Sequence, residues 1–272
     1  MSEVPLGSAP IAVVKVGSSV LAGAEAFRRT AVFLRNRHRA SWEERLVVVV
    51  SAQKGTTDNL ERTARRITPK PNAAALDLLW STGELRSVAL LVLHLQTLGI
   101  HAAALNIHEA GLIIPEIGRS TSLASVKLDA KRLLSALAIH PIAVVPGFFA
   151  SNSAHSIVSL GHGGSDLTAV LLARGLEACR CELIKDVPGY FTSDPRDDLD
   201  ARPVSSLTFE QALEIADGGC DLVQRKAIEA AAQFGIPLVV RSLDERAPTT
   251  CISDREVETN WSNFLPATVT AP

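Results

Sequence analysis

Short apolar runs rich in valine alternate along this chain with longer segments in which apolar residues recur at helical spacing. The run LVVVV at 46–50 is continuous, which is typical of a strand covered on both faces of a sheet. Strands that alternate with helices favour a parallel sheet, because parallel neighbours need long crossover connections and a helix is the usual one. We therefore expect an α/β fold with a mainly parallel central sheet and helices on both of its faces.

The expected elements cover most of the chain. Strands are expected at 11–17, 46–52, 101–107, 140–149, 155–160, 181–187 and 236–242. Helices are expected at 24–39, 56–66, 127–139, 167–178, 209–219 and 221–235, and two further helices between 73 and 98 meet near STGE at 81–84. With 272 residues the chain is long enough for one large α/β domain or for two lobes.

Composition argues against several classes of protein. Apolar residues make up 47% of the chain, its formal net charge is −2, and it has no basic tract, so nucleic-acid binding has no electrostatic support. Its apolar runs fall short of the roughly 20 residues of a membrane helix, and its first residues lack the pattern of a secretory signal. The four cysteines, at 179, 181, 220 and 251, match neither a CxxC nor a zinc pattern, so we expect reduced thiols in a cytoplasmic protein.

Ligands of open parallel sheets bind outside the carboxyl ends of the strands, so the residues that follow each strand form the candidate site. In KVGSS at 15–19, Lys15, a glycine and two serines follow the first strand, and they suit a phosphate or a surface turn equally well. In LGHGGSDLTA at 160–169 three glycines precede a helix, which is more than a helix cap needs. This stretch favours an anion-binding backbone nest with Asp166 beside it.

Three further stretches are less specific. The hydroxyls and glycine of SAQKGTTDNL at 51–60 bind an anion or, as the stretch alone favours, cap a helix. In KDVPGYFTSDPR at 185–196 a tyrosine and an arginine hold a base and its phosphates, or the stretch forms a long surface turn. Glu84 is a substrate contact or a solvated residue at a helix start. The histidines show no metal-ligand spacing, and no metal site formed by the protein is expected.

Taken together and in this order, these stretches resemble the amino acid kinase family, and most closely the catalytic domain of aspartokinases. The resemblance spans roughly residues 11–242 and is specific as a set, although each motif alone is weak. The stretches that carry it are KVGSSV at 15–20, VVVVSAQKGTTDNL at 47–60, STGELRS at 81–87, VVPGFFA at 144–150, LGHGGSDLTAVLLA at 160–173, KDVPGYFTSDPR at 185–196 and AIEAAAQFGIPLVVRS at 227–242.

The resemblance implies a carbamate kinase-like αβα sandwich formed by residues 1–272 as a single domain, without an ACT domain. An N-terminal lobe of about 10–150 would bind the phosphate acceptor, and a C-terminal lobe of about 151–260 would bind ATP. The reaction would transfer phosphate from ATP to a carboxylate, with Mg²⁺ held chiefly by the ATP phosphates. Family members often dimerise through the N-terminal lobe, so a homodimer is one assembly that the resemblance implies.

The resemblance also implies roles for individual residues. Lys15 would neutralise the transferring phosphoryl group, and Asp166 would orient Lys15 or hold the amino group of the acceptor. Acceptor contacts would come from Thr57, Glu84, His162, Gly163 and Ser165, and nucleotide contacts from Lys15, Gly17, Ser18, Lys185, Asp186, Tyr190, Asp194 and Arg196.

Three residues, a missing residue pair and a shortened loop depart from the aspartokinase pattern. His162 stands where aspartokinases carry an arginine that clamps the carboxylate of the substrate, and Lys185 replaces a threonine. Asp221 stands where a lysine helps to bind ATP, and the histidine–proline pair that follows that lysine is missing. The loop KVGSS is one residue shorter than its aspartokinase counterpart and is closer to that of glutamate 5-kinases.

Three functional hypotheses follow. The first is a kinase that phosphorylates the carboxylate of aspartate or a close analogue. The second is a kinase with another acceptor, such as glutamate, a modified amino acid, or a phosphate or phosphonate. The third is a weakly catalytic protein that binds a nucleotide or an oxyanion on the same fold.

Overall fold

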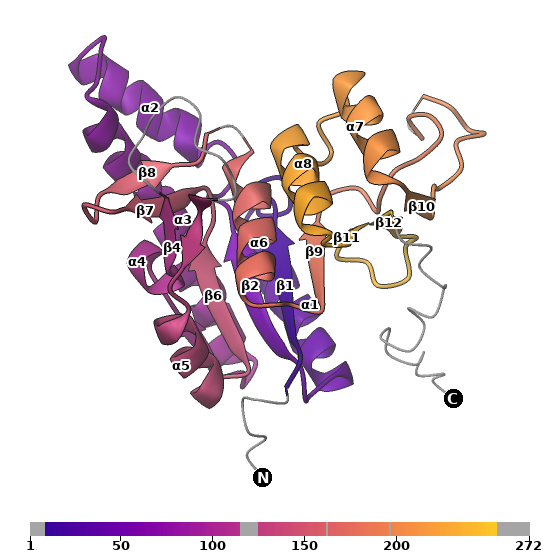
Figure 1. Ribbon diagram of the computed structural model, residues 1–272, viewed down its shortest axis with the longest axis horizontal. Coiled ribbons are helices and arrows are strands. Elements are labelled where there is room, and N and C mark those ends of the chain that lie inside the picture. Colours follow the sequence, from indigo (N-terminus) through magenta and orange to yellow (C-terminus); the bar gives the residue numbers. More distant parts are fainter. Residues whose placement is uncertain (1–8, 115–124, 162, 196, 255–272) are drawn as a thin grey trace.

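The computed structural model describes residues 9–114, 125–161, 163–195 and 197–254, and an eight-stranded sheet lies at the centre of these residues (Figure 1). Neighbouring strands are parallel except β11 and β12, which are antiparallel. The expected mainly parallel sheet is therefore confirmed. In spatial order the strands are β10 (Ser206–Leu207), β12 (Thr250–Ile252), β11 (Leu238–Arg241), β9 (Arg180–Ile184), β1 (Ile11–Val16), β2 (Arg45–Val50), β6 (Ile142–Pro146) and β3 (Ala102–Ala104).

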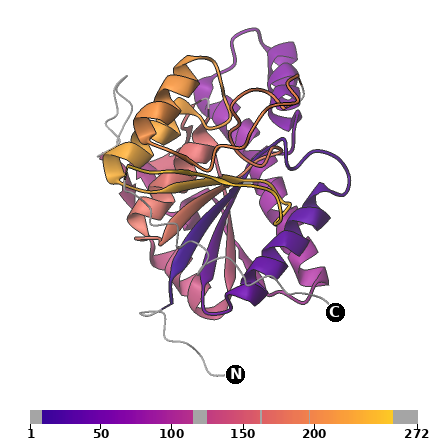
Figure 2. The ribbon, with the colours of Figure 1, turned by 90° about the vertical axis from the view of Figure 1, so that its right-hand side faces the viewer.

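The two faces of this sheet carry separate apolar cores, because successive side chains of a strand point to opposite faces. Val13 of β1 belongs to the core that contains Val170, whereas Val14 belongs to the core that contains Leu34 and Leu91. Figures 1 and 2 show the resulting three layers, with the sheet between two sets of helices. One face is covered by α1 (Ala26–Ala40) and α3 (Ala73–Thr97), and the other by α5 (Lys131–Ile139), α6 (Gly164–Gly175) and α8 (Arg225–Phe234), with α7 (Phe209–Asp217) against α8.

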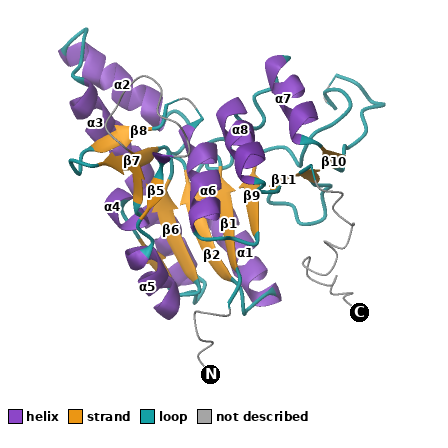
Figure 3. Cartoon of the chain, in the orientation of Figure 1, coloured by secondary structure: helices purple, strands orange, loops and turns teal. Residues whose placement is uncertain are grey.

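A smaller sheet lies beside α3, on the opposite side of the molecule from α7 (Figure 3). It brings together segments on both sides of the 115–124 region, which lies outside the described residues. Its strands, in spatial order, are β5 (Lys127–Leu128), β4 (Leu112–Ile114), β7 (Phe149–Asn152) and β8 (Ile157–Ser159). Of the nearby helices, α4 (Ile107–Ala110) contacts β7, and α2 (Thr56–Ile67) contacts α3.

The prediction of two helices between 73 and 98 is wrong, because α3 is one continuous helix from Ala73 to Thr97. Gly83 lies inside this helix, where it permits close packing and does not break the helix. A Cβ added at Gly83 would lie 3.1 Å from Ala52 Cβ and 3.2 Å from Thr56 Cγ2. By length and composition α3 could cross a membrane, alone among the helices of the described residues, yet its Leu91 is fully buried in a core against the sheet.

Tertiary contacts also move several predicted boundaries. The strand expected at 140–149 is divided, because β6 ends at Pro146 and β7 begins at Phe149 in the smaller sheet. Phe148 turns the chain between them with a φ of 69°. The helix expected at 127–139 begins only at Lys131, since 127–128 pairs with β4.

A buried network of charged side chains joins α1 to the sheet, and nothing in the sequence pattern indicated it. Glu182 of β9 lies 2.9 Å from Arg37 Nη2 and 2.7 Å from Arg180 Nε, measured from Oε1, and Arg241 Nη1 lies 3.6 Å from Oε2. Glu44 continues the network with an ion pair of 2.6 Å to Arg180 Nη2. Burial raises the pKa of Glu44 to about 7. Because these charges are desolvated, removal of one partner would leave the others unpaired in the interior.

Candidate active site

Two lysines and an aspartate meet where β1 and β9 end. Lys15 is the fifth residue of β1 and is paired in register with Leu183, Lys185 follows β9, and Asp166 lies in the first turn of α6. Lys15 Nζ lies 2.7 Å from Asp166 Oδ1, and Lys185 Nζ donates a hydrogen bond of 2.9 Å to Asp166 Oδ2. All three side chains are at most 10% exposed. The structure therefore joins KVGSS, GGSD and KDVPG in one cluster.

The cluster carries a surplus positive charge. Burial by itself would raise the pKa of the Asp166 carboxyl, but the two ammonium groups outweigh burial and hold that pKa well below its ordinary value. The carboxyl is thus ionised at neutral pH. Burial lowers the pKa of Lys185, and the charge of Asp166 opposes this effect. Two cations around one anion leave a net positive charge at the ends of the parallel strands. An anionic ligand that binds there would balance this charge.

The loop after β1 is attached to the end of β9. The N–H of Gly17 donates a hydrogen bond of 3.2 Å to Ile184 O, and Ser19 Oγ donates one of 3.0 Å to Asp186 Oδ1. Ser18 and Asp186 are exposed at this edge of the sheet. The predicted phosphate-binding residues Gly17 and Ser18 therefore lie beside Lys15 and next to the open end of the strands.

The glycine-rich stretch before α6 combines a tight turn with helix capping. Gly163 is the N-cap residue, with a left-handed φ of 77°, and a Cβ added to it would overlap the side chain of Gln224. The N–H of Gly164 is bonded to Gly161 O at 2.9 Å, and that of Asp166 to Gly163 O at 3.1 Å. These bonds use part of the expected nest for capping. Helix capping and anion binding are therefore not exclusive alternatives, because the turn that caps α6 also lies beside the two lysines. His162 lies outside the described residues.

Glu84 is a buried carboxyl, so its interpretation as a solvated helix-start residue is wrong. It is only 3% exposed in the middle of α3, and its Oε1 accepts a hydrogen bond of 3.2 Å from the N–H of Ala52. Within the described part of the chain, Glu84 Oε2 has no hydrogen-bond partner. Burial raises the pKa of this carboxyl to about 7. Thr57, the other predicted acceptor contact of this lobe, is half-buried in the first turn of α2.

The predicted nucleotide residues after β9 are spread over the surface and the core. Tyr190 is only 4% exposed and packs in the core, where its N–H donates to Thr250 Oγ1 at 2.8 Å and burial raises the pKa of its hydroxyl. A buried ring in this position does not offer a face for stacking on a base. Asp194 is exposed, and Arg196 lies outside the described residues.

Two residues near the cluster were missed by the sequence analysis. The N–H of Gln224 donates to Asp166 Oδ2 at 3.3 Å, and a Cβ added at Gly161 would lie 3.8 Å from Lys226 Nζ. Both residues belong to the DLVQRK segment, in which Asp221 is exposed and replaces the expected lysine. The sequence signal that could have indicated this segment is Lys226, which lies five residues after Asp221 at the start of α8.

A parallel αβα sandwich with lysines gathered at its strand ends defines an α/β protein with a buried, positively charged site. Residues 10–242 match the amino acid kinase family, and the chain belongs to this family. It is 35% identical to an aspartokinase of Thermus thermophilus over 248 residues, which are 91% of this chain and 60% of that relative. It is also 35% identical to an aspartokinase of Mycolicibacterium smegmatis over 89% of this chain and 57% of the relative. The chain thus spans about 60% of the length of these relatives.

Solved structures agree with this assignment. The aspartate kinase of Synechocystis aligns with a TM-score of 0.75 and 35% identity over 92% of this chain and 41% of that one. Aspartokinase III of Escherichia coli, solved with aspartate and ADP, aligns with a TM-score of 0.74 and 26% identity over 90% of this chain and 65% of that one. The uridylate kinase of Archaeoglobus fulgidus, at 18% identity and a TM-score of 0.61, shares the fold.

Proposed function

We propose that this protein transfers the γ-phosphoryl group of ATP to the carboxylate of a small amino acid, aspartate or a close analogue, and releases an acyl phosphate and ADP. The buried cluster of Lys15, Asp166 and Lys185 carries the proposal. Phosphoryl transfer depends mainly on positioning and on neutralisation of charge, and two ammonium groups fixed by one carboxylate supply both. The names of the aspartokinase relatives support the choice of acceptor.

In this reaction an oxygen of the acceptor carboxylate forms a bond to the γ-phosphorus. The bond between that phosphorus and the β–γ bridging oxygen breaks, and ADP leaves with its electron pair. No proton has to be removed from an ionised acceptor. Lys15 and Lys185 would stabilise the charge on the phosphoryl oxygens, and Asp166 would keep both ammonium groups in place without accepting a proton.

Magnesium is part of the proposal. The described residues contain no group of three histidine, cysteine or acidic side chains that would hold a metal ion. The ATP phosphates would therefore supply most of the ligands, and the ion would neutralise phosphate charge when bound. The exposed residues Ser18 and Asp186, with the buried Gly17 between Lys15 and Ser18, lie at the same edge as the lysines and would face the nucleotide.

Glu84 and Thr57 would bind the acceptor. A carboxyl with one oxygen unpartnered suits the ammonium group of an amino acid, and the charge of that group would favour ionisation of Glu84. His162, Gly163 and Ser165 complete the proposed set of acceptor contacts. In this arrangement the lobe of about 10–150 holds the acceptor, and the lobe of about 151–260 holds ATP, with Lys185 in the latter. A cytoplasmic, homodimeric enzyme completes the proposal.

A second candidate, an acceptor other than aspartate, is favoured by one observation. Histidine at 162 replaces the arginine that would hold the carboxylate of aspartate by two hydrogen bonds at once, and histidine offers a weaker contact. Glutamate, a modified amino acid, or a phosphate or phosphonate would then be the acceptor. A weakly catalytic binding protein is less well supported, because Lys15 and Asp166 are both retained in one ion pair.

Hydroxylamine trapping tests the proposal. The protein is incubated with ATP, Mg²⁺ and a panel that contains aspartate, glutamate and phosphonate analogues, and hydroxamate and ADP are measured. We expect hydroxamate and ADP with aspartate, and a loss of at least about 100-fold in kcat for Lys15→Ala, as when a charge-stabilising group is removed. Lys127→Ala, at an exposed site, is the matched control. ADP with a phosphonate alone would select the second candidate, and no ADP with any member would refute kinase activity.

A further inference from the structure

A positively charged pocket lies between α2 and α3, apart from the lysine–aspartate cluster. Its volume is about 500 Å³, which is in the range of small-molecule sites. Three of the nine residues that line it are cationic, namely Lys54, Arg62 and Arg86, and none is acidic. Since the whole chain has a net charge of −2, this is a strong local departure from its average.

The three cations are not neutralised by their surroundings. In the part of the chain that the structure describes, Lys54, Arg62 and Arg86 form no ion pair and no side-chain hydrogen bond. The contrast with Arg65, one turn away on α2, is direct, because Arg65 pairs with Glu61 at 2.7 Å. All three side chains are exposed, so water screens their mutual repulsion, and the positive charge that they add to the pocket attracts an anion.

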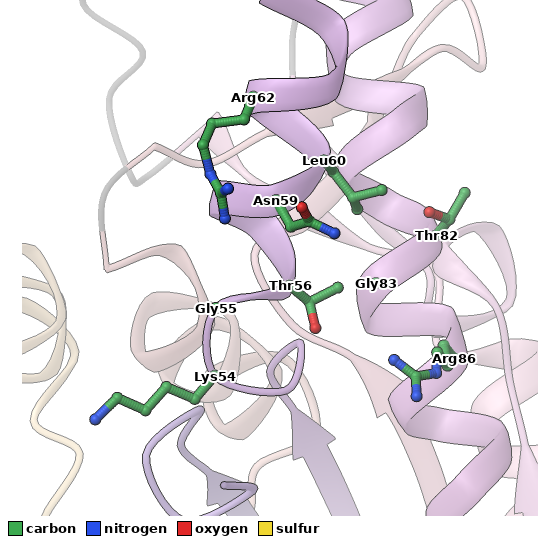
Figure 4. Close-up of a pocket in the computed structure, with 9 residues that line it drawn as sticks. All are labelled: Lys54, Gly55, Thr56, Asn59, Leu60, Arg62, Thr82, Gly83 and Arg86. Atoms are coloured by element: carbon green, nitrogen blue, oxygen red, sulfur yellow. The ribbon is translucent and has the colours of Figure 1, made fainter.

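The remaining lining residues suit an oxyanion. Thr56 and Asn59 supply hydroxyl and amide donors, whereas the Thr82 hydroxyl already donates a hydrogen bond of 2.7 Å to Leu79 O. Thr56 also begins α2, where the positive end of the helix dipole lies. Figure 4 shows Arg62 and Arg86 extending from different helices on opposite sides of the pocket, with Thr56 and Asn59 between them. A guanidinium group on either helix can donate paired hydrogen bonds to the oxygens of an anion that enters the pocket.

The pocket is separate from the predicted acceptor contacts but is next to them in the chain. On α3 the buried Glu84 and the exposed Arg86 are two residues apart and so about 200° apart around the helix. None of the residues that line the pocket is a predicted acceptor contact. However, Thr56 and Gly83 of the pocket directly precede the acceptor contacts Thr57 and Glu84 in the chain. An anion that bridges α2 and α3 would therefore hold the first turn of α2 against the segment that carries Glu84.

We infer that this pocket is a second ligand site of the protein, which binds a small oxyanion of charge −2 or more, either a phosphate group or a polycarboxylate. The inference does not depend on the proposed kinase function, because it rests on the pocket and its unpaired cations alone. Its test is a binding measurement and requires no turnover.

The test is titration calorimetry and thermal unfolding of the full chain with phosphate, sulfate or citrate, each compared with NaCl at equal ionic strength. We expect saturable binding and a rise in the unfolding midpoint with at least one of the three. Arg62→Gln and Arg86→Gln should each weaken this binding by about tenfold or more, since each removes a charge-assisted contact. Arg66→Gln, an exposed position one turn beyond Arg62 and outside the pocket, should leave it unchanged.

The variants also separate this pocket from the nucleotide site. If phosphate binds instead at the lysine–aspartate cluster, Lys15→Ala will abolish phosphate binding and Arg86→Gln will leave it unchanged. That result would overturn the inference. Equal binding by Arg62→Gln, Arg86→Gln and the unaltered protein would overturn it too, as would the absence of any effect beyond that of NaCl. Preference for phosphate and sulfate over citrate would assign a phosphate-bearing ligand, and the opposite preference a polycarboxylate.

Discussion

Glu84→Gln removes the ionisable proton of a buried carboxyl while it keeps the shape of the side chain. The amide oxygen of the new residue can still accept the hydrogen bond from the N–H of Ala52 that Glu84 Oε1 accepts at 3.2 Å. The substitution therefore isolates one effect, the free energy of placing a negative charge at a position that is 3% exposed. It tests the burial that the structure assigns to a residue of the proposed acceptor site.

The magnitude follows from the pKa. Burial raises the pKa of Glu84 from 4.5 to about 7, so the folded protein binds this proton more tightly than the unfolded chain does. The contribution of Glu84 to the free energy of unfolding therefore falls as pH rises from 4.5 to 7 and is constant above that range. At about 1.4 kcal/mol per pKa unit, the total change is about 3 kcal/mol. The glutamine variant carries no such penalty, because its amide has no charge to bury.

The assay is urea unfolding of both proteins between pH 5 and pH 8, with two probes to establish two-state behaviour. The difference between their free energies of unfolding cancels every other titrating group. We expect the variant to gain on the unaltered protein as pH rises, by about 3 kcal/mol at pH 8. Glu43→Gln, at an exposed carboxyl, is the matched control. A difference that is the same at every pH, or that favours the unaltered protein at pH 8, would refute the assigned burial.

Two further predictions concern the interior and the glycine-rich turn. Glu182→Leu should lower the free energy of unfolding by about 3–5 kcal/mol, because Arg37 and Arg180 lose a buried partner, and urea unfolding against the exposed-site control Glu210→Gln measures this. An unchanged midpoint would contradict a buried network. Gly163→Ala should cost more than the roughly 1–2 kcal/mol of a left-handed backbone, because its Cβ would overlap Gln224, whereas Gly219→Ala, with φ of 94° and open space around it, should show the backbone cost alone. Equal losses in the two alanine variants would show that Gln224 moves aside freely.

The local sequence pattern was sufficient to predict the bounds of elements that are buried to the same degree along their whole length. β1 and β2 were predicted within two residues, because a strand covered on both faces shows as a continuous apolar run. The prediction of two helices at 73–98 was wrong because the sequence pattern around Gly83 is the same in two cases. A glycine can end a helix, or it can lie inside one and allow a neighbouring segment to pack closely, as it does here. The start of β7 could not be read from its apolar residues, since a change of sheet leaves that pattern uninterrupted.

Part of the candidate site could be predicted from the sequence. Position after a strand indicated Lys15 and Lys185, and the glycines indicated Asp166, because ligands of parallel sheets gather at strand ends. The participation of Gln224 depends on how α8 packs against α6, which no local pattern contains. The burial of Glu84 and of Tyr190 likewise depends on neighbours distant in sequence. For Tyr190, aromatic character suggested a surface for a base, but the fold uses the ring as core.

By itself the sequence determined the parallel α/β class, the strand ends at which charge would gather, and membership of a kinase family through seven short motifs. These properties depend on the order and spacing of residues along the chain, which local sterics and burial convert directly into elements. Only the tertiary structure decided that Lys15 and Lys185 share one carboxylate, since 151 positions separate Lys15 from Asp166 and the contact exists only after the strands pair. The same holds for the cationic pocket: Lys54, Arg62 and Arg86 line one pocket because α2 packs against α3, and Gly83 permits this close packing.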